Sequence, residues 1–284
     1  MLDLIFLVCL NRSCVYCSDA TDLPWREAVT LFTNKSRATT MKTPNNRIGL
    51  IWPSDGVLDS ELWQFAPAHA SLHFTRTQVI DEPISLSLVE RMAEDTDIDY
   101  GAETLRPISP AVVTYACTSG SFVLGIDGEK QLLDRIERSA NAPSTTTSTA
   151  LAAACHALGL ERVAIAAPYI AEITDRLASF LEAKDIKVSK VTSMGLSHGI
   201  GDVSDEEVIQ LGIEANDAKS DGLVISCTNL RTADIIERLE GTLGKPVISA
   251  NQATMWHACQ IGQIDFPDAA GIGKLFELPA ITNV

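Results

Sequence analysis

The stretch VISCTNLRT, residues 224–232, contains the junction that decides the fold. Three of its first four residues suit a buried strand, but the run stops at Cys227 and continues at once with polar residues. A second stretch, AVVTYACTSGS at residues 111–121, has the same design, with Cys117 between an apolar run and a polar turn. Each stretch predicts a buried strand that ends in a thiol.

Apolar runs alternate with amphipathic ones from Arg47 onward, which is typical of a layered α/β protein with a largely parallel sheet. The alternation then starts again. The interval from Gly49 to Cys117 is 68 residues and that from Ala164 to Cys227 is 63. This duplication predicts two similar lobes related by a pseudo-two-fold axis. Because ligands bind beyond the carboxyl ends of parallel strands, we expect the two cysteines to face each other across one cleft.

The individual elements follow from the same patterns. We expect strands at residues 48–52, 71–80, 111–117, 162–168, 187–194, 222–227 and 245–249. We expect helices at residues 58–66, 129–140, 148–160, 171–185, 204–217, 233–244 and 252–262, and a mainly helical segment at 84–107. Residues 1–44 are predicted to be a poorly ordered extension, residues 45–150 and 255–284 one lobe, and residues 151–254 the other.

Charge and cysteine content exclude several classes of protein. The net charge of −15 and the lack of a Lys/Arg cluster argue against a nucleic-acid partner, because phosphate binding requires a basic surface. Seven cysteines in 284 residues are too few for a disulfide scaffold, which favours the reducing cytoplasm. The apolar opening MLDLIFLVCL is shorter than the roughly 20 residues of a membrane span and lacks the basic start of a signal peptide. We therefore expect a cytoplasmic protein with no membrane partner, and we also expect a homo-oligomer.

Two thiols at matched positions suggest chemistry, although either cysteine alone could be a core residue at a strand end. A thiol has an ordinary pKa of about 8.5, and a helix N-terminus or hydrogen-bond donors lower it, so each cysteine could be a thiolate near neutral pH. The Thr, Ser and Asn residues that follow suit N-cap positions and would leave amide N–H groups free to bind an oxyanion.

Other kinds of site find little support in the sequence. The five histidines show no metal-ligand spacing beside either thiol, and the Cys14 and Cys17 pair has no second pair nearby. Neither TSG nor GSF near Cys117 resembles the nucleophile elbow of serine hydrolases. The first strand leads into PSDG rather than into a GxGxxG dinucleotide fingerprint.

Four motifs in order resemble a known family. They are CTSGSF (117–122), PSTTTSTALAAACHALGLERVAIAAPYI (143–170), SCTNLRT (226–232) and KPVISANQATMWHA (245–258). Together they resemble the aspartate/glutamate racemase superfamily, and more narrowly its branch of maleate cis-trans isomerases, arylmalonate decarboxylases and racemase-like proteins of ectoine utilisation. The resemblance implies two Rossmann-like lobes with parallel four-stranded sheets, an active site between them, and neither a metal nor an organic cofactor.

The resemblance also implies roles for individual residues. Cys117 would be the nucleophile or first base, and Cys227 the partner acid. The hydroxyl residues after each cysteine and the tyrosine of APYI would bind the carboxylate of a small substrate, with the loop at 53–56 beside the cleft. The candidates for substrate binding are Ser54, Thr118, Ser119, Tyr169, Thr228 and Asn229.

Two positions distinguish among members of the branch. Decarboxylases resembling this chain have glycine where it has Cys117, which favours an isomerase or racemase. Maleate isomerases have Asn in the loop where this chain has Asp55, a carboxylate that would repel a dicarboxylate. We expect a cofactor-independent isomerase or racemase of small carboxylates. The sequence WHA in the last helix also resembles the ectoine-utilisation proteins. A decarboxylase of substituted malonates and a non-catalytic binding protein remain alternatives.

Four further residues have open roles. Arg231 could reach a carboxylate or be solvated at a helix start, and His198 in the loop GLSHGIG could belong to a lid or to the surface. His257 is expected to be packed or partly exposed, and Trp256 to anchor the core.

Overall fold

The computed structural model describes residues 9–10, 13–14, 45–79, 82–266 and 271–278. The chain divides into two units, Met1–Thr43 and Pro44–Val284. In the first unit, β1 (Cys9–Leu10) pairs in antiparallel fashion with β2 (Ser13–Cys14). The expected disorder of residues 1–44 and the side chains of the Cys14 and Cys17 pair lie outside what is described.

The first sheet of the second unit has four parallel strands in the order β4-β3-β5-β6. The strands are β3 (Arg47–Trp52), β4 (Ser71–Arg76), β5 (Val112–Tyr115) and β6 (Ser144–Thr146). The helices between them are α2 (Asp59–Phe65), α3 (Leu86–Glu94), α4 (Asp97–Leu105), η1 (Arg106–Ile108), α5 (Thr118–Phe122) and α6 (Gly125–Ala140). β3 lies inside the sheet, which explains why its residues are apolar in succession rather than in alternation.

The second sheet also has four parallel strands, in the order β10-β9-β7-β8. The strands are β7 (Arg162–Tyr169), β8 (Lys187–Leu196), β9 (Gly222–Ile225) and β10 (Val247–Ser249). The helices between them are α8 (Ala171–Glu182), η2 (Ile200–Asp202), α9 (Asp205–Ala215) and α10 (Ile236–Leu243). β8, one of the two edge strands, carries lysines and partly exposed residues, as edge strands commonly do.

Both sheets place their strands in the same order: second, first, third, fourth. This repeated topology confirms the predicted fold class, an α/β protein with two similar parallel four-stranded sheets. In such a sheet the connections diverge between the first and third strands, and a crevice opens beyond their carboxyl ends. Cys117 follows the third strand of one sheet and Cys227 the third strand of the other.

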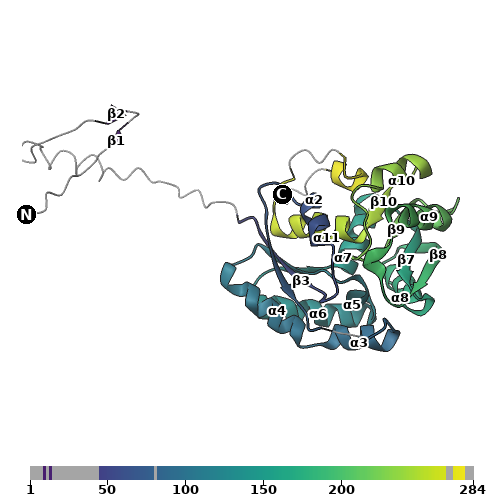
Figure 1. Cartoon of the computed structure of the whole chain (residues 1–284), viewed down its shortest axis with the longest axis horizontal. Coiled ribbons are helices and arrows are strands. Elements are labelled where there is room, and N and C mark those ends of the chain that lie inside the picture. Colours follow the sequence, from purple (N-terminus) through teal and green to yellow (C-terminus); the bar gives the residue numbers. More distant parts are fainter. Residues whose placement is uncertain (1–8, 11–12, 15–44, 80–81, 267–270, 279–284) are drawn as a thin grey trace, which may run out of the picture. The chain divides into compact units, whose positions relative to one another are not determined.

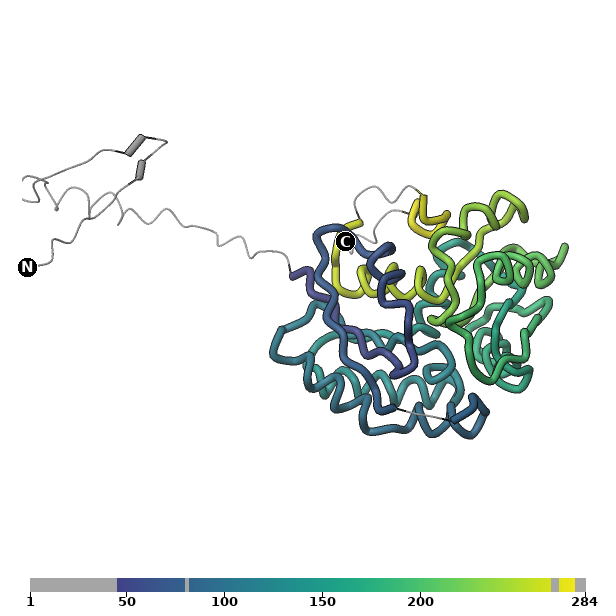
Figure 2. The backbone as a smooth tube through the Cα atoms, in the orientation of Figure 1, coloured from purple at the N-terminus to yellow at the C-terminus, as the bar shows by residue number. Residues whose placement is uncertain are grey.

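Two helices join the halves. α7 (Thr147–Ala157) and α11 (Ala250–Gly262) follow the fourth strand of each sheet and pack against each other (Figure 1). Thr146 and Ser249 cap them by accepting a backbone N–H with their side chains. α11 also packs against β5, β6 and α2, so the last long helix of the second half covers the first sheet (Figure 2). One apolar cluster therefore extends through both halves.

The element predictions differ from the structure at two places that bear on the site. The three-residue strand β6 was not predicted, because its sequence STT lacks the apolar residues of a buried strand. The TSGS segment, expected to be a turn, forms the short helix α5. The final short helix is η3 (Lys274–Glu277). Across the described residues, none of the helices has the length and apolar character needed to cross a bilayer.

Candidate active site

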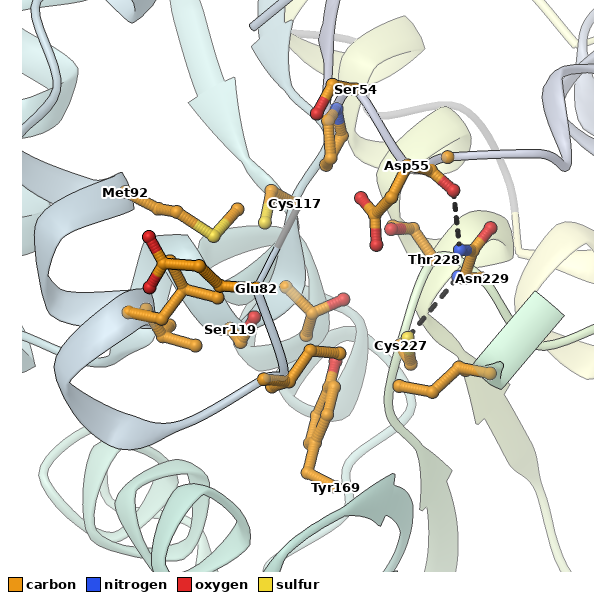
Figure 3. A pocket seen from close by; sticks show the side chains of 17 residues that line it. Ser54, Asp55, Glu82, Met92, Cys117, Ser119, Tyr169, Cys227, Thr228 and Asn229 are labelled. Atoms are coloured by element: carbon orange, nitrogen blue, oxygen red, sulfur yellow. Dashed lines mark hydrogen bonds between the residues drawn. The ribbon is translucent and has the colours of Figure 1, made fainter. Parts of the chain in front are cut away.

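A pocket lies where the loops after the first and third strands of both sheets meet (Figure 3). Loop 53–56 follows β3, and Tyr169 ends β7, so both first strands contribute. The two cysteines come from the loops after the third strands. All eight residues predicted for the site line this pocket: Ser54, Cys117, Thr118, Ser119, Tyr169, Cys227, Thr228 and Asn229.

Cys117 is the N-cap residue of α5 and is 4% exposed. Burial raises the pKa of its thiol, although the Gly120 backbone N–H and the Tyr115 and Ser119 hydroxyls beside it act in the opposite direction. Gly120 permits this close approach: a Cβ there would lie 2.6 Å from the Tyr115 hydroxyl and 3.2 Å from the Cys117 sulfur. The first thiol is therefore buried among donors.

Cys227 follows β9 in a strained backbone conformation, with φ of 108°. Positive φ in a residue with a side chain costs of order 1–3 kcal/mol and is found mainly where the surroundings hold it for a function. The Asn229 backbone N–H lies 3.4 Å from the Cys227 sulfur. Burial nevertheless raises the pKa of this thiol to about 12, against the lowering effect of the Tyr169 hydroxyl and the Asn229 N–H.

The expectation that donors lower the pKa of each thiol toward neutrality is therefore wrong. Burial raises the pKa of both thiols, because loss of contact with water outweighs the neighbouring donors, and this favours the protonated form. The expected helix N-terminus is present only after Cys117, since the chain after Cys227 forms a turn and α10 begins at Ile236. Nor does Thr118 serve as a cap, because Cys117 itself is the cap residue of α5, and Thr228 caps no helix because it lies in the turn before α10.

Neutral hydrogen-bond donors gather beside the thiols. Thr118 is 1% exposed, and within the described part of the chain its hydroxyl has no hydrogen-bond partner. A buried hydroxyl without a partner is costly, so an acceptor atom of a ligand would satisfy it. Burial and the adjacent Cys227 raise the pKa of Tyr169 far above its ordinary value, so its phenol remains a donor. These groups are able to bind a carboxylate without a basic side chain.

Asn229 is already engaged by the opposite half of the molecule. Its side-chain oxygen accepts the Val57 N–H at 2.9 Å, and its side-chain nitrogen donates to the Asp55 carbonyl at 3.0 Å. The amide thus ties the loop after β3 to the loop after Cys227. Its predicted contact with substrate stays a prediction.

The charged groups of the pocket are acidic. Asp55 and Glu82 line it, and none of its described lining residues is Lys, Arg or His. In Figure 3 the Asp55 carboxylate lies over the space between the two thiols. Although Asp55 as a residue is exposed, its carboxyl loses water contacts at the pocket, which raises its pKa. Its charge in turn raises the pKa of Cys117 and of Cys227.

An apolar wall completes the pocket, and it was not predicted from the sequence. It consists of Ile84, Leu88, Val89 and Met92, which lie on and just before α3. The amphipathic pattern of residues 84–94 was the available signal, but it predicts only that one side of the helix is covered. The volume of the pocket is about 70 Å³.

The residues with open roles fall outside this pocket. Arg231 is exposed and lines a separate hollow with Glu61 and Asp205. His198 is exposed and lies in a hollow that adjoins the pocket through shared residues, among them Asp55. Its place in a lid stays a prediction.

The two residues of the last helix behave as expected. Trp256 is 2% exposed in the core, which confirms it as an anchor. His257 is partly buried, and its Nδ1 lies 2.7 Å from the Thr145 hydroxyl. Among the described residues, no group of three or more His, Cys, Asp or Glu side chains is arranged to hold a metal ion.

Comparison with known proteins shows what this chain is similar to. A family model described as arylmalonate decarboxylase matches residues 67–276. The arylmalonate decarboxylase of Bordetella bronchiseptica is 33% identical over 180 residues, which are 62% of this chain and 75% of that protein. The maleate isomerase of Nocardia farcinica is 26% identical over 245 residues, 81% of this chain and 94% of that protein. The crystal structure of a double mutant of arylmalonate decarboxylase, in its liganded form, superposes with a TM-score of 0.73 at 29% identity, covering 83% of this chain and 99% of that one.

Proposed function

This chain belongs to the arylmalonate decarboxylase family, and from that premise we propose that it is an enzyme acting beside the carboxylate of a small acid. We further propose that its reaction is an isomerisation or racemisation that uses Cys117 and Cys227 and no cofactor. The ectoine-utilisation branch remains a prediction from the sequence alone.

The observation that carries this proposal is the symmetry of the two thiols. Each follows the third strand of its sheet, and both line one pocket. An enzyme that removes a proton from one face of a carbon and adds a proton to the opposite face needs a proton acceptor on one side and a proton donor on the other. Two equivalent junctions from a duplicated fold supply that pair.

The proposed chemistry proceeds through charge held by neutral donors. In a racemisation, one sulfur as thiolate takes the proton from the carbon next to the carboxylate, and the bonding electrons move into the carboxylate. The other thiol then gives its proton to the opposite face of the carbon. In a cis-trans isomerisation, the thiolate adds to one carbon of the double bond and the π electrons move into the carboxylate on the other carbon. The adduct rotates about the carbon–carbon bond that was double, and the returning electrons re-form the double bond as the carbon–sulfur bond breaks and the thiolate leaves. Thr118, Ser119 and Thr228 would stabilise the added charge in both cases.

The environments of the two thiols support different roles for them. Ionising Cys227, with a pKa of about 12, costs about 7 kcal/mol at pH 7. That thiol suits the proton donor. Cys117 has more donors around it, including the Gly120 N–H, and suits the base or nucleophile. These are the roles expected from the sequence.

Decarboxylation of a malonate is the second candidate, because the family model and the 33% identical relative both carry that name. Only one thiol is needed to protonate the carbanion left by loss of carbon dioxide. The size of the pocket supports a smaller substrate: its 70 Å³ is about half of the roughly 150 Å³ cavity that admits benzene. An arylmalonate would have to displace the apolar wall or extend out of the pocket.

The deciding experiment incubates the protein with maleate, arylmalonates and amino or hydroxy diacids in deuterated water and follows products by NMR. Isomerisation or deuterium exchange without carbon dioxide release is expected. Cys117→Ser and Cys227→Ser should each abolish it, whereas Cys155→Ala, which removes a buried thiol outside the pocket, should not. Carbon dioxide release that survives Cys117→Ser would establish the decarboxylase instead. Turnover unaffected by either serine variant would refute both, and ligand binding without turnover by the wild type would indicate a binding protein.

A further inference from the structure

Glu61 is a buried carboxylate in α2 that contacts the loop after Cys227. It is 4% exposed, and a single oxygen, Oε1, accepts the backbone N–H of Thr232 at 2.8 Å and that of Ala233 at 3.1 Å. The Thr232 hydroxyl also donates to this oxygen and lies 2.8 Å from the Ser249 hydroxyl. α2 belongs to the first half of the chain and the loop to the second, so this contact crosses between the halves.

The loop that Glu61 holds is the one that carries the second half of the site. Residues 227–229 line the pocket, and the segment ends at Thr232 and Ala233. Its near end is fixed to β7, since the Ser226 N–H donates to the Ala166 carbonyl at 2.9 Å. Its middle is held by Asn251, which donates to the Thr228 carbonyl at 2.9 Å. Glu61 supplies the anchor at the far end.

The strained backbone of Cys227 makes such an anchor necessary. A residue at φ of 108° would relax if the segment beyond it were free to move. Within the loop, the Asn229 side chain is tied to the loop after β3, and Leu230 is buried in the core while its backbone N–H donates to the Cys227 carbonyl at 3.3 Å. Glu61 adds the restraint beyond these residues, at Thr232 and Ala233. We propose that Glu61 is a positioning residue that holds the loop of residues 227–233 in its active geometry, and that its ionisation controls how firmly it does so. This inference rests on the proposed function for its kinetic test, but not for its labelling test.

The direction of the pH effect follows from the environment of the carboxyl. Burial raises the pKa of Glu61 to about 7, while the donors from Thr232, Ala233 and Asn251 act to lower it. Hydrogen bonds to an ionised acceptor are about twice as strong as those to a neutral one. While the carboxyl remains in this contact, its hydrogen bonds to the loop therefore become stronger as pH rises through 7 and the group ionises. The titratable groups facing the adjoining hollow are Asp205 on α9 and Arg231 and Asp234 in the loop, and α11 presents the neutral Asn251.

Stability should change in the opposite direction, which separates positioning from simple folding. The raised pKa means that the unfolded chain ionises Glu61 first, near pH 4.5, so its contribution to stability falls between pH 4.5 and 7. Activity governed by the firmness of the loop should instead rise toward neutral pH. A merely structural role would make both decline together.

Three variants test the inference kinetically. Glu61→Gln keeps an oxygen acceptor but cannot ionise, and Glu61→Ala removes the acceptor. Glu240→Gln is the matched control: Glu240 is 8% exposed, accepts the Val247 N–H at 3.0 Å, has a pKa raised by burial and lies outside the pocket. With the acid that the enzyme turns over, ionisation of the thiol makes kcat rise with pH in every variant, so the test is the ratio of kcat in the wild type to kcat in Glu61→Gln. This ratio should rise several-fold between pH 6 and 8, kcat should fall at least about tenfold in Glu61→Ala because the thiol is misplaced, and Glu240→Gln should match the wild type. A ratio that stays constant across this pH range would overturn the inference.

Labelling of Cys227 with iodoacetamide tests the same inference without turnover. Glu61→Ala should label about tenfold faster than the wild type, because a released loop exposes the sulfur, and Glu61→Gln should remain within about twofold. If the wild type processes no acid but Glu61→Ala labels faster, the proposed function fails and the positioning role stands. Equal labelling of a folded Glu61→Ala and the wild type would refute the positioning role.

Discussion

The reactivity of Cys227 in the substrate-free protein should be far lower than that of an ordinary thiol. Its pKa is raised from 9.0 to about 12 by burial, a difference worth about 4 kcal/mol. At pH 7.5 this leaves a thiolate fraction about 1,000-fold smaller than that of an unperturbed cysteine. Because the thiolate is the nucleophile, alkylation should be slower by a similar factor. The rate should continue to rise about tenfold per pH unit through pH 9, where a free thiol levels off.

The measurement is the rate of iodoacetamide labelling at Cys227, followed by mass spectrometry of its peptide between pH 6.5 and 9.5. Restricted access alone would slow the reaction at every pH without changing the position of the plateau, so the shape of the profile carries the test. Asp55→Asn should label faster at each pH, because the Asp55 charge raises the pKa of Cys227. A plateau below pH 8 would show that the thiol ionises near neutrality and would refute the argument from burial.

Two predictions concern stability. Burial lowers the pKa of His257 to about 4, so as pH drops from 6.5 toward 4 the unfolded chain binds a proton before the folded one does, and stability falls. In urea unfolding between pH 7.5 and 5, the wild type should lose about 2 kcal/mol more unfolding free energy than His257→Gln. Equal losses in the two proteins would contradict this prediction. A Cβ on Gly56 would lie 1.8 Å from Nε1 of the buried Trp52, so Gly56→Ala should cost about 1–3 kcal/mol and weaken substrate binding. The control is Gly241→Ala in α10, where the added Cβ would meet open space, so this substitution should be neutral or stabilising. Similar urea midpoints for Gly56→Ala and Gly241→Ala would be evidence against the clash with Trp52.

The fold was predictable because short apolar runs mark its strands and because the same order of strands and helices occurs twice along the chain. Runs such as RVAIAAP at residues 162–168 are too apolar for an exposed segment, and the repeat of strand, helix and strand appears twice. β6 escaped prediction because Thr145 and Thr146, at 1% and 0% exposure, are buried by hydrogen bonding rather than by apolar character. Threonine in an edge strand has no periodic signal.

The site was predictable only where its residues belong to motifs. The residues beside the two cysteines are contiguous in sequence and came together as expected. Glu61 was not predictable, because a glutamate in LDSELWQFA is typical of the solvated side of a helix. Its burial depends on Thr232, which is 171 residues away. The pKa of each thiol was predicted in the wrong direction, since sequence reveals the nearby donors but not the depth of burial.

The raised pKa values of the two thiols depend on each other, and this dependence suits the proposed reaction. A charge on Cys117 raises the pKa of Cys227, so ionising one sulfur makes ionising the other harder. The Asp55 carboxylate strengthens this opposition for both. Under the proposed mechanism, at most one thiolate would therefore form, and its partner would remain the proton donor. Proton transfer between two faces of a carbon requires this complementary state in either direction of reaction. Two thiols ionised independently by basic residues would more often be charged together, and neither would then have a proton to give. The lack of Lys, Arg and His among the described lining residues thus agrees with the chemistry proposed for a chain of net charge −15.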